Sequence, residues 1–375
     1  METNVPALFD SSVPFETCAM QVYQTVLETL PVYRSFASSF PDPDGDINAI
    51  PLIPVQAFQD FDLIGSGLQA ETVFQSSGTA GDRRSRHPVA DLSLAREAVM
   101  IGFQRYFSLD NTTILCYAPG YADNPQSSLL WMMQQLIDRT AKHGSRFLPL
   151  GEPLQREEWA RLDGQGRRII LFGAAFGLLD LAEMDSFALP PNTTIIETGG
   201  MKTYRREMGR EALHETLATV FRLDRTQIWS EYGMCEMTSQ CYAPGVRSGV
   251  DEVDGGAKPD ARGRVEGGSK GAKPDAMERV VGIDGSAEED CGFRSPHWVR
   301  ISIRDPLNPM RICETGEEGK IGIMDLANVH SCPFFLTEDK GVSLETVDGE
   351  AVRFQVLGRW KQTMLRGCNF LIDTE

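Results

Sequence analysis

Apolar residues recur at helical spacing in two stretches of the first hundred residues. In residues 14–40 they return every three or four positions, which predicts a helix stopped by Pro31 and a second short helical segment after it. Between Leu92 and Tyr106 the same spacing predicts a helix with one buried face. The chain therefore opens with amphipathic helices.

From residue 112 onward, short β-branched runs alternate with amphipathic segments. Strands are predicted at 112–117, 169–172, 193–196 and 227–229, and helices at 127–142, 178–184 and 205–221. This alternation favours an α/β fold in layers, with buried and largely parallel strands. Period-two runs at 298–304, 320–326 and 351–357 predict a β-rich closing region.

The composition changes abruptly between residues 245 and 292, where glycine and charged residues replace almost all large apolar side chains. The hexapeptide GAKPDA occurs twice in this segment, which therefore cannot bury a core and is interpreted as a duplicated, flexible insertion. The predicted organisation is an α/β core at 1–244, the insertion at 245–292, a β-rich remainder at 293–357 and a short tail at 358–375.

Charge and cysteine usage exclude several classes of protein. The formal net charge of −17 makes nucleic acid and anionic membranes poor partners. No run of 18 apolar residues and no signal-peptide pattern is present in the sequence, so a cytoplasmic location without a membrane span is expected. The eight cysteines form no CxxC pair, which favours free thiols over a zinc site or a disulfide framework.

The sharpest motif is FQSSGTAGDRRSRH at residues 74–87. Its serine, glycine and threonine residues offer backbone N–H groups and hydroxyls that can surround a polyphosphate. The motif lacks the Gly-Lys-Ser/Thr ending of the P-loop, so it is either a different triphosphate loop or a polar turn.

Two further motifs supply an aromatic ring, carboxylates and guanidinium groups. In SEYGMCE, Tyr232 could stack a base while Glu236 binds a hard cation through oxygen. Asp339 lies in LTEDKG, and Arg359 and Arg366 follow beside glycines in an otherwise acidic chain. Taken singly, each residue could equally be a core aromatic, a solvated carboxylate or a surface arginine.

The order and spacing of these motifs resemble the adenylate-forming superfamily, and more closely the acyl-protein synthetase (LuxE) family. That family includes the fatty-acid-activating subunit of the bacterial bioluminescence reductase. The resemblance covers residue 14 to the carboxyl end, apart from the insertion. It rests on SSGT at 76–79, ETGG at 197–200, EYGMCE at 231–236, SQCY at 239–242, DLAN at 325–328, TED at 337–339 and RGC at 366–368.

The resemblance implies a layered, adenylate-forming-enzyme-like large domain with a truncated C-terminal part. It also implies ATP and Mg²⁺ as cofactors. Phosphates would lie against Ser76, Ser77, Gly78, Thr79 and Gly81; the adenine and acyl pocket against Gly199, Gly200 and Tyr232; Mg²⁺ against Glu236; and the ribose against Asp339 and Arg359. Cys368 would accept the acyl group as a thioester.

Three features depart from the wider superfamily. Ala80 replaces a threonine that is usual in the phosphate loop, and Cys235 stands where threonine is preferred. The chain also stops seven residues after Cys368, without the small C-terminal domain and adenylation lysine of CoA ligases. The acyl-protein synthetase family ends in the same way.

Three functions follow as hypotheses. The first is ATP-dependent activation of a carboxylic acid, in the family a long-chain fatty acid, and transfer to a protein cysteine for delivery to an acyl reductase. The second is transfer to CoA or to a carrier protein. The third is a non-catalytic nucleotide-binding scaffold. The sequence leaves the acid and the pathway open, because the acyl pocket is assembled from dispersed apolar residues.

Overall fold

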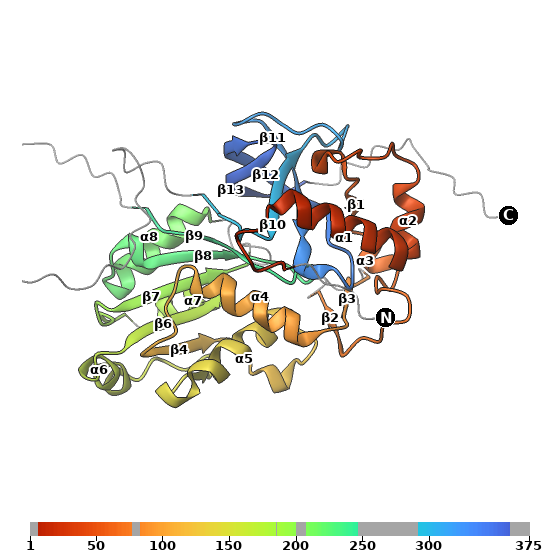
Figure 1. Cartoon of the computed structure of the whole chain (residues 1–375). Helices are drawn as coiled ribbons and strands as arrows, with labels where there is room; N and C mark the ends of the chain where they lie inside the picture. The colour runs from red at the N-terminus through yellow and green to blue at the C-terminus, as the bar shows by residue number, and fades with distance from the viewer. Residues whose placement is uncertain (1–6, 77–82, 185, 200–207, 247–291, 361–375) are drawn as a thin grey trace, which may run out of the picture.

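The computed structural model describes residues 7–76, 83–184, 186–199, 208–246 and 292–360. These residues form two large sheets and a separate two-stranded one (Figure 1). The insertion predicted at 245–292 falls almost entirely outside the described residues, as do the end of the tail and most of the predicted phosphate loop. The prediction that the insertion is flexible therefore stays a prediction.

The first sheet is the predicted α/β layer. Its strand order is β5-β4-β6-β7-β8-β9, parallel except for β9. The strands are β4 (Thr112–Tyr117), β5 (Arg146–Leu148), β6 (Arg168–Ala174), β7 (Thr193–Thr198), β8 (Ile228–Tyr232) and β9 (Cys241–Ala243). Strand β4 is buried along its whole length, as a strand covered on both faces must be.

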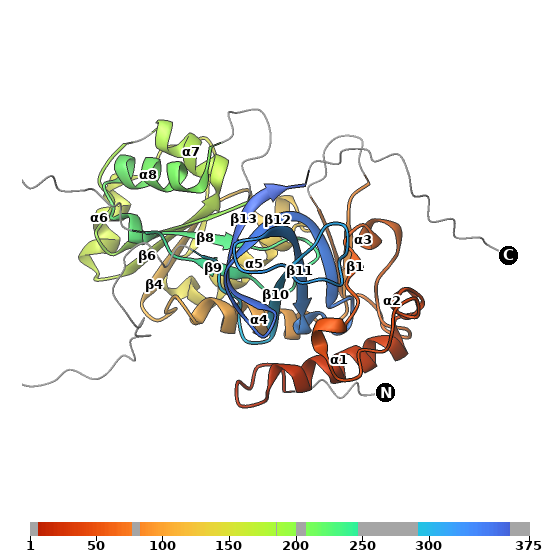
Figure 2. The same cartoon turned by 90° about the horizontal axis from the view of Figure 1, so that it is seen from above.

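Helices cover both faces of this sheet (Figure 2). Two helices, α4 (Leu92–Gln104) and α5 (Ser128–Thr140), form one apolar layer with it. Three others, α6 (Arg156–Gly164), α7 (Ala175–Met184) and α8 (Arg210–Phe221), form the opposite layer. The Asp91 carboxylate caps α4 by accepting from two backbone N–H groups, and the Ser127 hydroxyl caps α5.

The helix predicted at 205–221 is shorter in the described residues: 208 and 209 are not helical, and residue 205 lies outside the described residues. The helix begins at Arg210, because the backbone of Gly209 is extended and acts as its N-cap. Because glycine adopts extended backbone conformations easily, a helical pattern in the sequence can run through Gly209 although the helix itself begins only after it.

The second sheet is the β-rich closing region. It contains β1 (Ile53–Pro54), β10 (Val299–Arg304), β11 (Glu318–Asp325), β12 (Phe334–Val347) and β13 (Glu350–Arg359), in the order β1-β12-β11-β10 with β13 on the other part of β12. The opening helices α1 (Phe15–Thr29) and α2 (Pro31–Ala37) share its apolar core. Because β1 pairs with β12, a segment near the start of the described chain lies beside one near its end.

A short ribbon joins the two sheets. Strands β2 (Thr72–Gln75) and β3 (Arg86–Val89) are antiparallel and flank the predicted phosphate loop, and helix α3 (Ala57–Asp60) lies beside β3. Short 3-10 turns occupy Ile47–Ala49, Tyr121–Asp123, Ala141–His143, Arg225–Gln227 and Leu326–Asn328. No helix in the described part of the chain has the length and apolar character required to cross a membrane.

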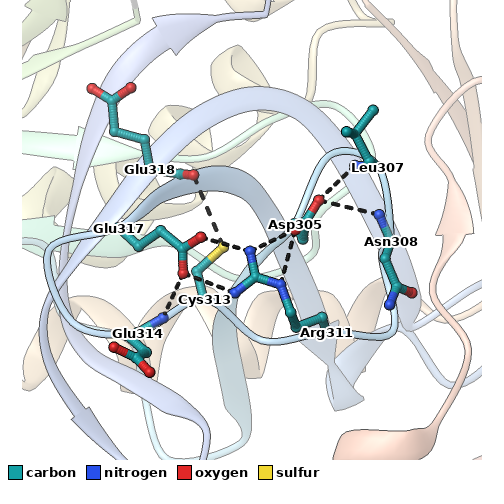
Figure 3. A network of polar contacts seen from close by, with 8 residues as sticks. All are labelled: Asp305, Leu307, Asn308, Arg311, Cys313, Glu314, Glu317 and Glu318. Atoms are coloured by element: carbon teal, nitrogen blue, oxygen red, sulfur yellow. Dashed lines mark hydrogen bonds and ion pairs between the residues drawn. The ribbon is translucent and has the colours of Figure 1, made fainter.

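The hairpin between β10 and β11 is held by an exposed polar network (Figure 3). Arg311 donates to the Asp305 carboxylate through Nε at 2.8 Å and to both carboxylate oxygens of Glu317 at 2.6 and 2.9 Å. Asp305 also accepts from the backbone N–H of Leu307 at 2.7 Å. The hydrogen bonds from Arg311 lower the pKa of Glu317 to about 2.

Arg311→Gln is expected to loosen this hairpin with little change in the melting temperature of the protein, because exposed ion pairs contribute little to global stability. Amide hydrogen exchange should become faster in residues 305–317 and stay unchanged elsewhere. In the parent, acid should have the same local effect, because protonation of Glu317 as the pH falls from 4.5 toward 2 removes the acceptor. Arg34→Gln, an exposed change on α2, is the control; equal exchange in both variants would contradict the interpretation.

Candidate active site

The structure describes half of the site residues predicted from the sequence. Ser76, Gly199, Tyr232, Glu236, Asp339 and Arg359 are within it, whereas Ser77, Gly78, Thr79, Gly81, Gly200 and Cys368 lie outside the described residues. Four of the described residues gather where the end of β8 meets the second sheet, although they come from segments about a hundred residues apart.

Asp339 is the centre of this group. Its carboxylate accepts from the Tyr232 hydroxyl at 3.1 Å and from Nε of Arg359 at 3.2 Å. Arg359 is its direct neighbour on β13, so strand pairing fixes the second contact. The Asp339 side chain is 14% exposed and that of Arg359 59%, so the pair lies at an edge that solvent and a ligand can reach. Burial, followed by the Asp339 charge, raises the pKa of Tyr232 well above its ordinary value.

Glu236 lies close to this pair and is almost fully buried, at 5% exposure. Burial raises the pKa of its carboxyl, and the negative charge of Asp339 adds to that effect. A hydrogen bond from Ser85 and the positive charge of Arg359 act in the opposite direction. A buried carboxylate in this setting gains from a cation placed beside it.

The two ends of the predicted phosphate loop meet beside Glu236. The backbone N–H of Ser85 donates to the Ser76 hydroxyl at 3.0 Å, and the N–H of Ser76 donates to the Ser85 carbonyl at 3.1 Å. Because Ser85 also hydrogen-bonds to Glu236, the loop begins and ends against the buried carboxylate. The described residues on the two sides of the loop, Ser76 and Ser85, are therefore held together next to Glu236.

A buried histidine holds the segment that carries Glu236. The His87 ring bonds the Cys235 carbonyl through Nδ1 at 2.8 Å and the Asn328 carboxamide oxygen through Nε2 at 2.7 Å. The Asn328 amide in turn donates to the Glu236 carbonyl at 2.7 Å. Burial lowers the pKa of His87, although both hydrogen bonds act against it. These contacts fix the backbone on both sides of residue 236.

The residues after Glu236 are attached to the second sheet by Asp325. Its buried carboxylate accepts from the backbone N–H groups of Thr238 at 2.8 Å and Ser239 at 2.9 Å, and from the Ser239 hydroxyl at 2.7 Å. The indole N–H of Trp298 donates to that hydroxyl at 2.8 Å. Burial raises the pKa of Asp325, although the hydrogen bonds from Ser239 and Thr238 act in the opposite direction. One carboxylate thus joins the first sheet's loop to the second sheet.

Another buried carboxylate, that of Glu231, lies where β7 and β8 end. Glu231 accepts a hydrogen bond from the Thr198 hydroxyl, and Gly199 follows with φ +84°. Burial raises the pKa of Glu231 to about 7, and the charge of neighbouring Glu197 adds to it. A Cβ on Gly233 would lie 2.5 Å from the Glu231 carboxylate, so a side chain at that position would force this carboxylate to move. The Glu231 side chain therefore joins the ends of β7 and β8, next to Tyr232.

The described cysteines are poorly suited to nucleophilic attack. Cys18, Cys116, Cys241, Cys313 and Cys332 are buried, and Cys235 is partly buried. Burial raises the pKa of the Cys235 thiol, and the charge of Glu236 raises it further. Since the thiolate is the nucleophile, Cys235 is a weak alternative to Cys368.

Sequence reasoning gave no role to Ser85, His87, Asn328 or Glu231. All four stand inside quoted motifs: RSRH, DLAN and SEYGMCE. The signal that could have identified them is the high density of polar residues in these three motifs, which stand in or next to strands. Such residues must find partners when buried, but the sequence does not show which ones are buried.

The donor set suits Mg²⁺ bound together with a nucleotide. Among the described residues, no three histidine, cysteine, aspartate or glutamate side chains gather as a metal site. Mg²⁺ commonly takes one or two protein carboxylates, with substrate phosphates and water completing its shell. Glu236, beside the ends of the phosphate loop, can supply such a carboxylate.

Comparison with solved structures identifies the fold. The chain is similar to 2-hydroxyisobutyryl-CoA ligase in complex with 2-HIB-AMP and CoA in the thioesterification state, with a TM-score of 0.56 and 14% identity over 94% of this chain and 69% of that one. The open conformation of that ligase gives a TM-score of 0.54 and 13% identity over 96% and 75%. ATP-bound MatB from Rhodopseudomonas palustris is 16% identical, with a TM-score of 0.46, and this chain covers 47% of its length.

The predicted fold class is thereby confirmed: the chain has the layered α/β fold of adenylate-forming ligases. Identities this low show the fold and leave the reaction to be argued from the site. Neither the protein-family models nor the curated proteins give a match to this chain.

Proposed function

We propose that this protein is an ATP-dependent ligase that converts a carboxylic acid into an acyl-adenylate. The observation that carries the proposal is the convergence of Tyr232, Asp339, Arg359 and Glu236 at one edge, beside the ends of a serine- and glycine-rich loop. In the reaction, a carboxylate oxygen of the acid attacks the α-phosphorus of ATP. The bond from that phosphorus to the bridging oxygen breaks, and pyrophosphate leaves.

Each group has a distinct task in this proposal. Asp339 can accept hydrogen bonds from vicinal ribose hydroxyls, and Arg359 holds its carboxylate in place. Tyr232 orients the other oxygen of Asp339 through its hydroxyl, while its ring is buried against Phe293 and Phe354. Glu236 would hold Mg²⁺, which, when bound, neutralises charge on the triphosphate. The loop at 76–81 would surround the phosphates.

The second half of the proposed reaction transfers the acyl group to Cys368. The Cys368 thiolate attacks the carbonyl carbon, the bond to the adenylate oxygen breaks, and AMP leaves with a thioester formed. The positive charge of Arg366, two residues away in the sequence, favours the thiolate. We further propose a long-chain fatty acid as substrate and an acyl reductase or carrier protein as recipient.

Two measurements on one pair of variants test this proposal. Carboxylate-dependent exchange of labelled pyrophosphate into ATP should occur in the parent and equally in Cys368→Ser, because adenylation precedes the thiol. Hydroxylamine-labile acyl label should appear on the parent and on the control Cys235→Ser, but not on Cys368→Ser. Absence of exchange with any fatty, aromatic or short-chain acid would leave only a nucleotide-binding scaffold.

Transfer to CoA is the second candidate, because the 2-hydroxyisobutyryl-CoA ligase structures of the same fold contain CoA. It predicts exchange activity together with formation of acyl-CoA and no stable label on the protein. The two functions are thus separated by where the labelled acyl group is found.

A further inference from the structure

An arginine-lined cavity lies on the outer side of the segment that closes the phosphate loop. It has a volume of about 290 Å³ and is formed by α3 and the residues after it, by the last residue of β2, and by residues 83–86. Three arginines, Arg83, Arg84 and Arg86, face two aspartates, Asp60 and Asp62, across it. The cavity walls are therefore net positive in a chain whose formal net charge is −17.

Residues 84–87, of which the last two begin β3, alternate between this cavity and the candidate active site. Ser85 and His87 are buried and contact the Glu236 segment, whereas Arg84 and Arg86 are exposed. Side chains of successive strand residues point to opposite faces. The same short segment therefore presents hydrogen-bonding groups inward to Glu236 and guanidinium groups outward to the cavity.

The arginines keep unused hydrogen-bond donors. Arg83 donates through Nη1 to Asp60 at 2.8 Å, and Arg86 lies 2.9 Å through Nη1 from the Asp62 carboxylate. Each contact uses one of the five N–H donors of a guanidinium. Arg84 makes no side-chain hydrogen bond or ion pair with the described residues. Both ion pairs are solvent-exposed, with 73% exposure for the Arg83 side chain, so a stronger anion can compete for the arginines.

We infer that this cavity is a second anion site, which binds a phosphoryl group separately from the nucleotide at Glu236 and Asp339. Arginine binds phosphate oxygens through two parallel N–H groups, and the polar cavity, at the small end of ligand sites, suits a compact anion. Two sources share this chemistry under the proposed function: the pyrophosphate product, and the phosphate of a phosphopantetheine-bearing acyl acceptor. The identity of these two molecules rests on the proposed function, whereas the binding test of the site does not.

The binding test uses inorganic pyrophosphate and calorimetry at 150 mM salt. With the active site filled by α,β-methylene-ATP and Mg²⁺, the full-length parent should still bind one pyrophosphate. The double variant Arg84→Gln/Arg86→Gln should bind it at least about tenfold more weakly, because two charged donors are lost. Arg139→Gln, an exposed change on α5, should leave binding unchanged.

The reverse change provides a test with the opposite sign. Asp60→Asn/Asp62→Asn frees two guanidinium groups and should tighten pyrophosphate binding, which a purely structural role for these ion pairs would not produce. No second binding event in the parent, or equal binding in the parent, Arg84→Gln/Arg86→Gln and Asp60→Asn/Asp62→Asn proteins, would overturn the inference. Neither result depends on turnover, so pyrophosphate exchange into ATP reports separately on the proposed function.

Turnover then identifies the source. If the ligand is the leaving product, inhibition by pyrophosphate should weaken in the arginine double variant. If it is the acceptor, the KM for 4′-phosphopantetheine should rise while that for pantetheine, which lacks only the phosphate, stays the same. If neither changes, the cavity has no part in the reaction and both proposed sources of the phosphoryl group are wrong, while the binding test alone decides whether the site exists.

Discussion

Glu236→Gln is expected to slow magnesium-dependent adenylate formation by about two to three orders of magnitude, the usual cost of removing one charged group that stabilises a transition state. The amide keeps the shape of the side chain and can still accept a hydrogen bond from Ser85, but it cannot carry negative charge. Cation binding at the nucleotide phosphates would lose its protein carboxylate. The measurement is pyrophosphate exchange as a function of Mg²⁺ concentration.

The dependence on Mg²⁺ separates this role from a structural one. Glutamine resembles the protonated acid that burial already favours at this position, so folding should be unharmed or improved. The variant should therefore melt no lower than the parent while requiring more Mg²⁺. Glu28→Gln, an exposed change on α1, is the matched control. An unchanged Mg²⁺ requirement in Glu236→Gln would place the cation elsewhere.

The α/β layer was predictable because its strands are covered on both faces. Such strands are continuous apolar runs, and Thr112–Tyr117 was predicted with its observed bounds. Strand β12, with 14 residues, was missed. Its middle carries the charged run at 338–340, which has no period-two pattern. It is a strand because β11 and β13 pair with it on both sides, and sequence patterns do not show such long-range pairing.

The candidate site was predictable in part for a similar reason. The spacing of the motifs that contain Tyr232, Glu236 and Asp339 supported the resemblance, and the structure brings these residues together. The residues that hold them were not predictable, because burial decides their roles. His87 reads as an ordinary polar residue until the fold places its ring between two carbonyl oxygens.

Glu231→Gln is expected to remove a pH dependence of stability in the neutral range. The pKa of Glu231 is raised from 4.5 to about 7, mainly by burial and further by Glu197. The folded state therefore favours the protonated carboxyl. Its stabilising contribution is complete below about pH 4.5 and is lost as the pH rises through 7. A pKa shift of this size corresponds to a decrease in the free energy of unfolding on the order of 3 kcal/mol between pH 4.5 and pH 8.

The comparison between parent and variant isolates this carboxyl. Denaturant unfolding at pH 5 and pH 8 should show a larger loss of stability in the parent than in Glu231→Gln, while Glu28→Gln should follow the parent. Three titratable groups face Glu231: Glu197 on β7, and Cys241 and Tyr242 on β9. The two on β9 have raised pKa values and are uncharged at these pH values, so they do not titrate in the window. Equal pH dependence in parent and Glu231→Gln would show that another group is responsible.

The same titration reaches the candidate active site through the backbone. Protonated Glu231 can accept from Thr198, which lies next to Gly199, while its other oxygen occupies the space that a side chain at Gly233, the residue after Tyr232, would need. Ionisation places a buried negative charge at these strand ends, so the segments that carry Gly199 and Tyr232 should loosen as the pH rises through 7. Amide exchange at these two strand ends should therefore accelerate between pH 6 and pH 8, beyond the intrinsic rate change, in the parent but not in Glu231→Gln. If exchange follows the intrinsic rate in both, the carboxyl stabilises the fold without controlling the shape of the site.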